Sequence, residues 1–495
     1  MDFIGLSEGL QQLPAPLFYV GATVLLLVSL LILRVASNHM TFKAPPVYEP
    51  IPFVGGLIKF VQGPMRLMSD GYRSKGEVFT VPLAHKKMTF LLGPHVSAHF
   101  FKANDDEMSQ QEVYEFNVPT FGKGVVFDVD HKVRAEQFQF FAAALKTAKL
   151  HTYVPYFVSE ATEFFGKWDQ QGVVELQTEL SHLIILTASR TLMGREVREN
   201  MFRQVTDLYH DLDMGMLPIS VMFPYLPIEA HRKRDRAREE LSKIFAKVIQ
   251  ARKASGAQEN DLLQHFIESR YRTVYNGRMT NEEEITGFLI ATLFAGQHTS
   301  SITSSWTGYF MMTHKEKWMK PAIEEQKRLM REHGEELSVE VLNKMEVLHA
   351  IITEALRLFP PLIMLLRKAK TSFSVTTSKG QQYVVPKGHI IFASPAFSHR
   401  LAGVFERPDE FEPDRFQAPR EEDKRRPFSF IGFGAGRHGC MGSNFAYLQI
   451  KTIWSVMLRN FDFEMVDPFP QAQYNSLVVG PGPCRVKYMR RKLKV

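Results

Sequence analysis

The sequence predicts one large, mainly α-helical domain with small β-sheets, preceded by a single membrane-spanning helix. Amphipathic helical patterns cover most of residues 131–270 and recur at 280–314, 345–359 and 443–460. Alternating patterns that indicate strands are short and few, and one long uncharged apolar run stands near the N-terminus. Because no internal repeat and no domain boundary after residue 50 is visible, we expect the body to be one domain.

The composition of the 495-residue chain is that of an ordinary globular protein, with 45% hydrophobic and 23% charged residues. Its two cysteines, Cys440 and Cys484, cannot form a disulfide framework, which indicates a reducing compartment. The net charge of +7 suits an anionic membrane surface or an acidic protein partner. We expect no nucleic-acid partner, because the basic residues are dispersed and no nucleic-acid motif is present.

The N-terminal segment, residues 1–38, contains the predicted membrane anchor at about residues 13–33. Residues 17–33 carry no charge and are rich in Leu, Val and Ile. Asp2 and Glu8 argue against a cleaved signal peptide, which would begin with basic residues. Since positive charges follow the run, at Arg34 and Lys43, we expect a luminal N-terminus and a cytosolic body. The alternative is a buried core helix.

A proline-rich linker at residues 39–53 separates this anchor from the domain at 54–495. Four prolines in eight residues predict a stiff, extended spacer. Residues 78–83 and 88–92 then predict a short hairpin. Residues 114–130 contain apolar side chains without a clean period, which favours an ordered, aromatic-rich loop.

The helical region 131–270 has predicted breaks near Lys149, Gly172 and Gly194. A Pro- and Met-rich break at 217–227 precedes a very basic helix start. These residues could touch lipid headgroups, although a solvated helix face explains the charges equally well.

The longest predicted helix opens at Thr280, with Glu283 completing a capping box, and ends near His314. Its centre reads Ala-Gly-Gln-His-Thr-Ser at 295–300. A mid-helix glycine is costly, and Thr299 can compete for a backbone carbonyl and open the helix locally. We interpret this as a functional distortion; a close helix crossing would explain the glycine alone.

Two further patterns precede the C-terminal region. Glu354 and Arg357 share a face of the helix at 345–359, where most such pairs are surface decoration. Residues 373–393 predict a small antiparallel hairpin, and residues 405–416 are irregular.

The loop at 433–442 carries the strongest motif, F-x-x-G-x-x-x-C-x-G, and the helix at 443–460 follows it. At the mouth of this helix, unpaired N–H groups and the helix dipole would favour the thiolate of Cys440. Such a thiolate can be the axial ligand of a haem iron. The alternative is a glycine-rich loop that contains a buried cysteine.

Four motifs thus stand in order: A-G-x-x-T at 295–299, E-x-x-R at 354–357, P-x-R-F at 413–416 and the cysteine loop. The chain resembles a microsomal cytochrome P-450 over about residues 45–495. The pattern Y-x-F-x-x-P-x-F-G-x-x-V at 114–125, together with 295–300, is similar to the sterol 14α-demethylase signatures. Drug-metabolising relatives usually carry an acid where this chain has His298.

The resemblance assigns roles to individual residues. Cys440 is the proximal ligand of the iron of haem b, and Thr299 and His298 serve oxygen binding and proton delivery. Glu354, Arg357 and Arg415 form the buried network that holds the cysteine loop. Lys132 and Arg134 lie on the helix that faces the electron donor. The cofactor-binding set is Tyr114, Arg134, Arg367, Phe433, Gly434, His438 and Cys440.

For the substrate, the resemblance implies a sterol that loses its 14α-methyl group in three oxidations. Phe116 resembles the plant-type enzymes, which favour one methyl at carbon 4, as in obtusifoliol, over two, as in lanosterol. Alternatively, Phe116 only packs the loop. The substrate-contacting set is Tyr114, Phe116, Phe121, Phe127, Ala291, Phe294, Ala295, Leu362, Met364, Leu477 and Val478.

The resemblance also implies partners and location: O2 and NADPH through a cytochrome P-450 reductase, azole-type inhibitors on the iron, and a monomer in the endoplasmic reticulum membrane with a cytosolic catalytic domain at 54–495. One rival is a general microsomal monooxygenase of another apolar substrate, and another is a haem-thiolate carrier or sensor without oxygen chemistry. Ala435 and Gly439 are smaller than the residues often found in the cysteine loop.

Overall fold

The computed structural model describes residues 43–49, 55–83, 86–256, 258–474 and 476–494, with the isolated positions Thr23, Leu26 and Ser29. The predicted anchor at 13–33 and much of the linker at 39–53 therefore lie outside the described residues. Within the described part, no helix combines the length and apolar character needed to cross a bilayer.

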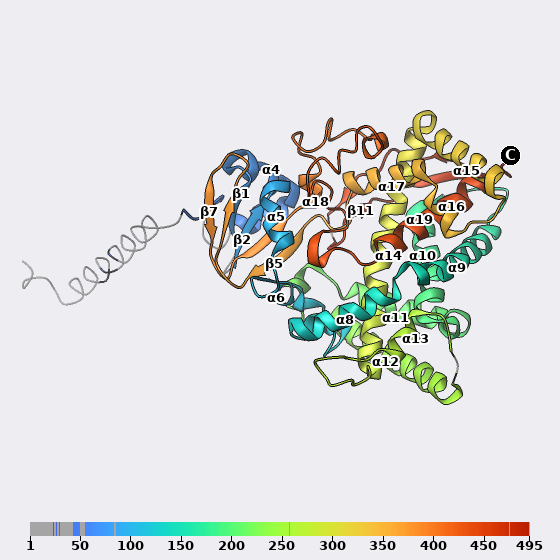
Figure 1. Cartoon of the computed structure of the whole chain (residues 1–495), viewed down its shortest axis with the longest axis horizontal. Coiled ribbons are helices and arrows are strands. Elements are labelled where there is room, and N and C mark those ends of the chain that lie inside the picture. The colour runs from blue at the N-terminus through green and yellow to red at the C-terminus, as the bar shows by residue number, and fades with distance from the viewer. Residues whose placement is uncertain are drawn as a thin grey trace, which may run out of the picture.

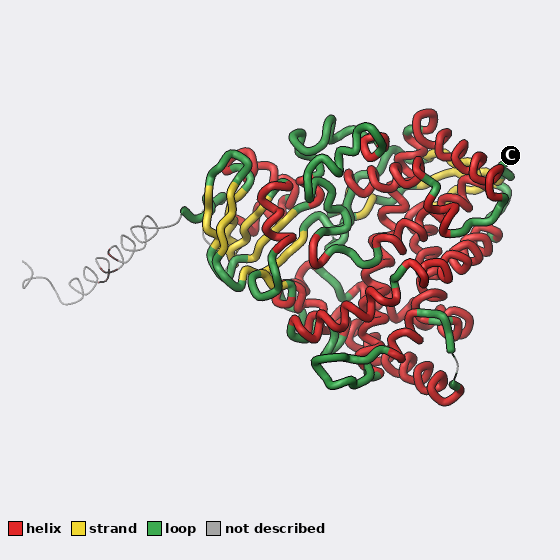
Figure 2. The backbone as a smooth tube through the Cα atoms, viewed as in Figure 1, coloured by secondary structure: helices red, strands yellow, loops and turns green. Residues whose placement is uncertain are grey.

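The structure is mainly α-helical with small β-sheets, as predicted (Figure 2). The helices are α3 (Gly55–Gln62), α4 (Pro64–Lys75), α5 (Pro94–Lys102), α6 (Gln111–Tyr114), α7 (Val118–Phe121), α8 (His131–Ala144), α9 (Thr147–Gly166), α10 (Leu176–Ala188), α11 (Phe202–Met214), α12 (Glu229–Ser255), α13 (Leu262–Glu268), α14 (Glu282–Thr313), α15 (Lys320–His333), α16 (Val339–Asn343), α17 (Glu346–Leu358), α18 (Pro395–Ser398) and α19 (Ser443–Asn460). The strands are β1 (Val78–Leu83), β2 (Lys86–Leu91), β3 (Met108–Ser109), β4 (Gln171–Glu175), β5 (Leu365–Ala369), β6 (Phe373–Thr376), β7 (Gln382–Val385), β8 (Ile390–Ala393), β9 (Phe461–Met465), β10 (Ala472–Gln473), β11 (Gly480–Pro481) and β12 (Arg485–Arg490). Short 3-10 or π turns are η1 (Glu115–Asn117), η2 (Val126–Asp128), η3 (Ser189–Met193), η4 (Val197–Met201), η5 (Pro218–Val221), η6 (Lys315–Met319), η7 (Pro413–Phe416) and η8 (Gly436–His438).

The largest sheet has the strand order β1-β2-β8-β5-β3 and lies to one side of the helical mass (Figure 1). β1 and β2 pair antiparallel, with Val78 opposite Leu91, which confirms the predicted hairpin. β6 and β7 form the core of the second predicted hairpin. β8, which was expected in the same hairpin, instead pairs with β2 and β5, because its apolar side chains are buried in the larger sheet.

Helix α14 passes through the centre of the helical region, between α17 and α12 (Figure 1). Its capping box is Asn281 with Glu284, one residue later than predicted: Asn281 Oδ1 accepts from the Glu284 N–H at 2.8 Å, and Glu284 Oε2 accepts from the Asn281 N–H at 2.8 Å. The prediction for residues 114–130, an ordered loop without helix or strand, is wrong. This region contains the helical turns α6, η1, α7 and η2 rather than a loop without helix. The predicted break at Gly172 falls in β4.

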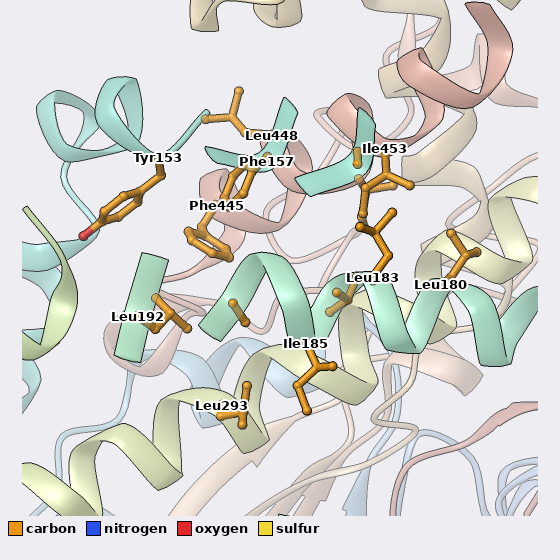
Figure 3. Packing of buried hydrophobic residues seen from close by; sticks show 14 of the residues in the cluster. Tyr153, Phe157, Leu180, Leu183, Ile185, Leu192, Leu293, Phe445, Leu448 and Ile453 are labelled. Atoms are coloured by element: carbon orange, nitrogen blue, oxygen red, sulfur yellow. The ribbon is translucent and has the colours of Figure 1, made fainter. Parts of the chain in front are cut away.

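The main core joins α9, α10, α14 and α19. Figure 3 shows Leu183 of α10 facing Ile453 of α19, with Ile185 directed toward Leu293 of α14. Phe157 of α9 contacts Phe445 at a ring distance of 5.0 Å. Because α14 carries residues 295–300 and α19 follows the cysteine loop, this apolar packing fixes both motifs in one rigid body.

Candidate active site

The cysteine loop is a tight turn that leads into α19. The Cys440 N–H donates to the Phe433 carbonyl at 2.8 Å, and the Gly434 N–H donates to the Ile431 carbonyl at 2.9 Å. Gly436 has φ +65°, and a Cβ atom there would lie 2.0 Å from the Phe101 carbonyl oxygen on α5. Only glycine therefore allows the loop to approach α5 this closely. At Gly439 a Cβ would find ordinary van der Waals room, so this departure from the usual motif leaves the loop unchanged.

Two opposing effects act on the pKa of the Cys440 thiol in the protein. Desolvation raises the pKa of Cys440, and a hydrogen bond from the Gly442 backbone lowers it only in part. A bound metal cation deprotonates a coordinating thiol outright. The loop is thus suited to a thiolate ligand only together with a cation such as haem iron.

A polar cluster lies beside the loop and combines Arg134 of α8, Arg367 of β5, His438 of η8 and Asp105. Arg134 Nη2 donates to Asp105 Oδ1 at 2.6 Å, and His438 Nε2 lies 3.4 Å from the same oxygen. Burial acts to raise the pKa of Asp105, but His438, Arg134 and Arg367 outweigh it and lower this pKa to about 2. Burial lowers the pKa of Arg367 to about 10. The Tyr114 hydroxyl accepts from the Leu366 N–H at 3.2 Å, next to Arg367.

Several nitrogens in this cluster are buried without a hydrogen-bond partner among the described residues. They are Arg134 Nη1, Arg367 Nε and both ring nitrogens of His438. Such orphaned donors are rare unless a ligand satisfies them. Two arginines and a histidine face only one carboxylate here, so the cluster is suited to the two carboxylates of a porphyrin. The predicted cofactor set therefore fits haem.

The motif pair Glu354 and Arg357 is buried rather than exposed, and Arg415 joins it. Glu354 accepts from Arg357 Nε at 2.6 Å and from Arg415 Nε at 3.0 Å, with all three side chains 0% exposed. Glu422, which is equally buried, accepts from Arg415 Nη1 at 2.8 Å. Glu412, also buried, lies 3.7 Å from Arg415 Nη2, and Arg420 pairs with both Glu412 and Glu422, so every buried charge of the network has a partner of opposite sign.

His399 connects this network to the cysteine loop. Its Nδ1 lies 3.1 Å from the Arg357 carbonyl oxygen, and its Nε2 lies 2.8 Å from the Ile431 N–H. Because the carbonyl can only accept and the N–H can only donate, the ring is the neutral Nδ1–H form. Burial, aided by Arg357, lowers the pKa of His399 to about 3, so the ring stays neutral. Ile431 in turn bonds Gly434, which explains how the network reaches the loop.

The centre of α14 holds the predicted catalytic pair. Thr299 Oγ1 donates to the Ala295 carbonyl at 2.7 Å, as expected, yet α14 remains one continuous helix, so the predicted opening is wrong. A Cβ atom added at Gly296 would meet nothing within 4 Å. The glycine is therefore not required by a close crossing of α14 with another helix. His298 Nε2 lies 3.0 Å from Asp213 Oδ1 of α11.

Six aromatic side chains form a row from the 114–130 region to α14 and α11, hereafter the aromatic row. Successive ring centroids are 6.3, 5.3, 6.3, 6.1 and 6.0 Å apart. In order, the residues are Phe116, Tyr114, Phe127, Phe121, Phe294 and Tyr209. Phe294 lies about one helical turn from His298, so the row passes beside the catalytic pair before it ends at Tyr209 of α11.

The remaining predicted substrate residues lie in two neighbouring segments and on α14. The Val479 N–H donates to the Pro361 carbonyl at 2.8 Å, which joins the segment of Leu477 and Val478 to that of Leu362 and Met364. Leu362 is 44% exposed. Ala291 packs against the main core, whereas Ala295 is exposed.

Sequence reasoning missed Asp105, Asp213, His399 and Glu422. Asp105, Asp213 and His399 act through partners 29, 85 and 42 positions away, and Glu422, although only seven positions from Arg415, belongs to no short motif, so no local signal identified them. Of the two residues expected on the helix that faces the electron donor, Arg134 is 2% exposed and bound to Asp105, whereas Lys132 is exposed.

Comparisons with known proteins agree with this geometry. The family model described as cytochrome P450 matches residues 45–488. The chain is 56% identical to the obtusifoliol 14-alpha demethylase of Sorghum bicolor, with 98% of both chains covered. It is 57% identical to the sterol 14-demethylase of Arabidopsis thaliana, over 92% of this chain and 93% of that protein. A retinoic acid bound cyanobacterial CYP120A1 structure shares the fold, with a TM-score of 0.78, 21% identity and coverage of 91% of this chain and 100% of that one. The cysteine loop, the buried Glu–Arg network and these matches together show that the chain belongs to the cytochrome P450 family.

Proposed function

We propose that the protein is a sterol 14α-demethylase. It oxidises the 14α-methyl group of a sterol to the alcohol and then the aldehyde, and a third oxidation releases formic acid and leaves a ring double bond. Each oxidation uses one O2, two protons and two electrons that come from NADPH through a reductase. The observation that carries this proposal is the aromatic row, which runs from the sterol-demethylase signature to α14 beside His298 and Thr299.

Haem b, bound at Cys440, supplies the activation of O2 when it is present. Arg134, Arg367 and His438 are the donors for its carboxylates. Thr299 presents a hydroxyl on α14, and His298 would carry a proton toward that hydroxyl. The aromatic row supplies an apolar wall that orients the sterol and excludes water.

Asp213 tunes His298 for proton delivery. Burial acts to lower the pKa of His298, but the hydrogen bond and charge of Asp213 outweigh it, and the pKa is raised from its ordinary value. The ion pair between His298 and Asp213 is therefore complete below about pH 6.5 and is lost as the pH rises through the raised pKa of His298. A proton is therefore available at a higher pH than a free histidine would allow.

His298→Ala and Thr299→Ala should leave folding and sterol binding intact, while turnover falls about 10²- to 10⁴-fold, as expected for lost proton transfer. Reducing equivalents should pass to peroxide or water instead of product.

Asp213→Asn should move the alkaline fall of kcat to lower pH, because it removes the charge that raises the pKa of His298. The measurement is product formed per NADPH consumed, across pH.

The matched control is His210→Ala, since His210 is an exposed histidine of α11. It should change neither the coupling nor the pH profile. Native coupling in both α14 variants would show that these residues only pack the helix.

The sterol is proposed to carry one methyl at carbon 4, as obtusifoliol does. The relative from Sorghum bicolor, an obtusifoliol 14-alpha demethylase by name, supports this choice. Phe116, at the start of the aromatic row, supplies the physical reason. A ring against carbon 4 leaves less room for a second methyl, and overpacking costs about 1–3 kcal/mol. This corresponds to a preference of roughly ten- to a hundredfold.

The test is turnover by the purified protein with a microsomal reductase on obtusifoliol and on lanosterol. We expect faster 14α-demethylation of obtusifoliol, and Phe116→Leu should narrow the gap. The control is Phe164→Leu, because Phe164 is a partly buried residue of α9; this variant should keep the difference in turnover between the two sterols. Equal native turnover of both sterols would refute the preference. NADPH-dependent oxidation without loss of the methyl group would favour a general monooxygenase, and no NADPH-dependent turnover would favour a carrier or sensor.

The proposed setting is the endoplasmic reticulum membrane, with residues 13–33 as a single-pass anchor and the domain at 54–495 in the cytosol as a monomer. Ile219, Phe223 and Tyr225 follow α11 and are exposed by 44%, 54% and 68%. Exposed apolar side chains in one segment are suited to lipid contact. Lys132 is the proposed contact for the reductase, and azole-type inhibitors are proposed to ligate the haem iron.

A further inference from the structure

The turn at Gly124–Asp128 joins the two halves of the aromatic row and holds a strained backbone. Val126 has φ +48°, in a region that a β-branched residue rarely adopts. Its neighbour Phe127 contacts both Tyr114 and Phe121 in the row. Because such conformations cost free energy, the surrounding structure must hold them in place.

Gln137 of α8 supplies this hold. Its Oε1 accepts from the Val126 N–H at 2.7 Å, and its Nε2 donates to the Gly124 carbonyl at 2.8 Å. The same Nε2 donates to the Tyr271 hydroxyl at 2.9 Å. The side chain is 0% exposed, and its amide orientation is fixed, since one partner can only donate and another can only accept.

The chain of hydrogen bonds continues to α14. The Tyr271 hydroxyl donates to Glu284 Oε1 at 3.0 Å, and Glu284 is the carboxylate of the capping box that begins α14. Arg278 Nη1 donates to Glu284 Oε2 at 3.0 Å, so the carboxylate is fully engaged. Gln137 therefore stands on a rigid support rather than on a mobile side chain.

Phe121 and Val125, on the N-terminal side of Val126, pack directly against α14. A Cβ added at Gly287 of α14 would lie 2.5 Å from the Phe121 carbonyl oxygen and 2.6 Å from Val125. Arg238 of α12 donates to the Phe121 carbonyl through Nε at 3.3 Å. Phe121 is thus positioned independently of Gln137, whereas Phe127 depends on the turn that Gln137 closes.

We propose that Gln137 is a positioning residue for substrate selection: it holds the Val126 turn so that Phe127 supports Tyr114, and Tyr114 supports Phe116 against carbon 4 of the sterol. The part that concerns the sterol rests on the proposed function. Gln137 touches neither the substrate nor the cofactor, and it acts through Val126 and Phe127.

The first test is independent of catalysis. In Gln137→Leu the Val126 N–H and the Gly124 carbonyl lose their partner, and amide exchange of residues 122–128 in the holoenzyme should accelerate at least about tenfold. Gln449→Leu is the control, because Gln449 is equally buried but bonds Thr187 on α10. Unchanged exchange in Gln137→Leu would overturn the proposal whatever the native enzyme demethylates. If the native protein demethylates neither sterol, the proposed function fails while this result stands.

The second test is a double-mutant cycle on sterol preference. Gln137→Leu should reduce the preference for the 4-monomethyl sterol roughly tenfold. Glycine adopts φ +48° without strain, so in the Val126→Gly background the same change should have little effect. If Gln137 only stabilised the fold, Val126→Gly would not remove the effect of Gln137→Leu on sterol preference. If the two substitutions reduce the preference independently, so that their fold-changes multiply in the double variant, the proposal is contradicted. If Gln137→Leu fails to fold, Gln137→Glu replaces it in both tests, because glutamate keeps the shape and the bond from the Val126 N–H but cannot donate to the Gly124 carbonyl. A Gln137→Glu enzyme with the sterol preference and the amide exchange of the native protein would also overturn the proposal.

Discussion

Cys440→Ala is expected to abolish the red-shifted Soret band that a thiolate-bound haem shows in the reduced, CO-bound protein. Cys440 is the cysteine of the loop, and desolvation raises the pKa of its thiol, so iron favours the thiolate that the spectrum requires. The band therefore reports the joint presence of Cys440 and iron. Since no other side chain in the loop can supply a thiolate, the loss should be complete, and monooxygenase activity should disappear with it.

Cys484→Ala is the matched control for this experiment. Cys484 is buried in the main core beside β12, with Sγ 3.8 Å from the Pro468 carbonyl oxygen. Its replacement removes one buried sulfur and should leave the spectrum unchanged. If both variants keep the band, another ligand holds the iron and the assignment of Cys440 is wrong.

Removal of one member of the buried network should prevent stable folding of the haem-loaded protein. Glu354→Ala leaves the guanidinium groups of Arg357 and Arg415 without their shared carboxylate in a fully buried site. Leaving a buried charge unpaired costs about 3–5 kcal/mol, a large part of the stability of an ordinary domain. Thermal unfolding and haem content of the purified protein provide the measurement.

The comparison variant is Lys167→Ala, which breaks the pair with Glu163 at 2.8 Å on the surface of α9. Exposed pairs of this kind contribute about 1 kcal/mol or less. If Glu354→Ala is as stable as Lys167→Ala, the buried network does not contribute to the stability of the fold. Arg415→Ala tests the two halves of the network separately. It keeps the Glu354–Arg357 pair, and among the described residues it leaves Arg420, at 2.6 Å, as the one cation paired with Glu422.

Elements with a clear local signal were predicted well. α19 begins and ends where the sequence indicated, at Ser443 and Asn460, because apolar periodicity and the preceding glycine-rich loop mark its start. The hairpin of β1 and β2 was also predicted, since alternation over six residues is a strong strand signal. α14 was placed within two residues at its start.

Contacts between distant segments could not be predicted in this way. Asp213 reaches His298 across 85 positions of sequence, and Gln137 reaches Tyr271 across 134. No periodicity or motif encodes such pairings, because they depend on how whole helices pack. The same holds for the pKa of Cys440: the helix mouth was visible in the sequence, but the stronger effect of desolvation was not.

Two glycines of the cysteine loop differ in how far they tolerate substitution. At Gly436 the Phe101 carbonyl oxygen occupies the space that any side chain would need, so we expect evolution to retain glycine there wherever the loop packs against α5 in this way. At Gly439 the φ of −59° is open to every residue type, and a Cβ would make only ordinary van der Waals contacts. We therefore expect natural variation in this loop to be admitted at Gly439 and excluded at Gly436.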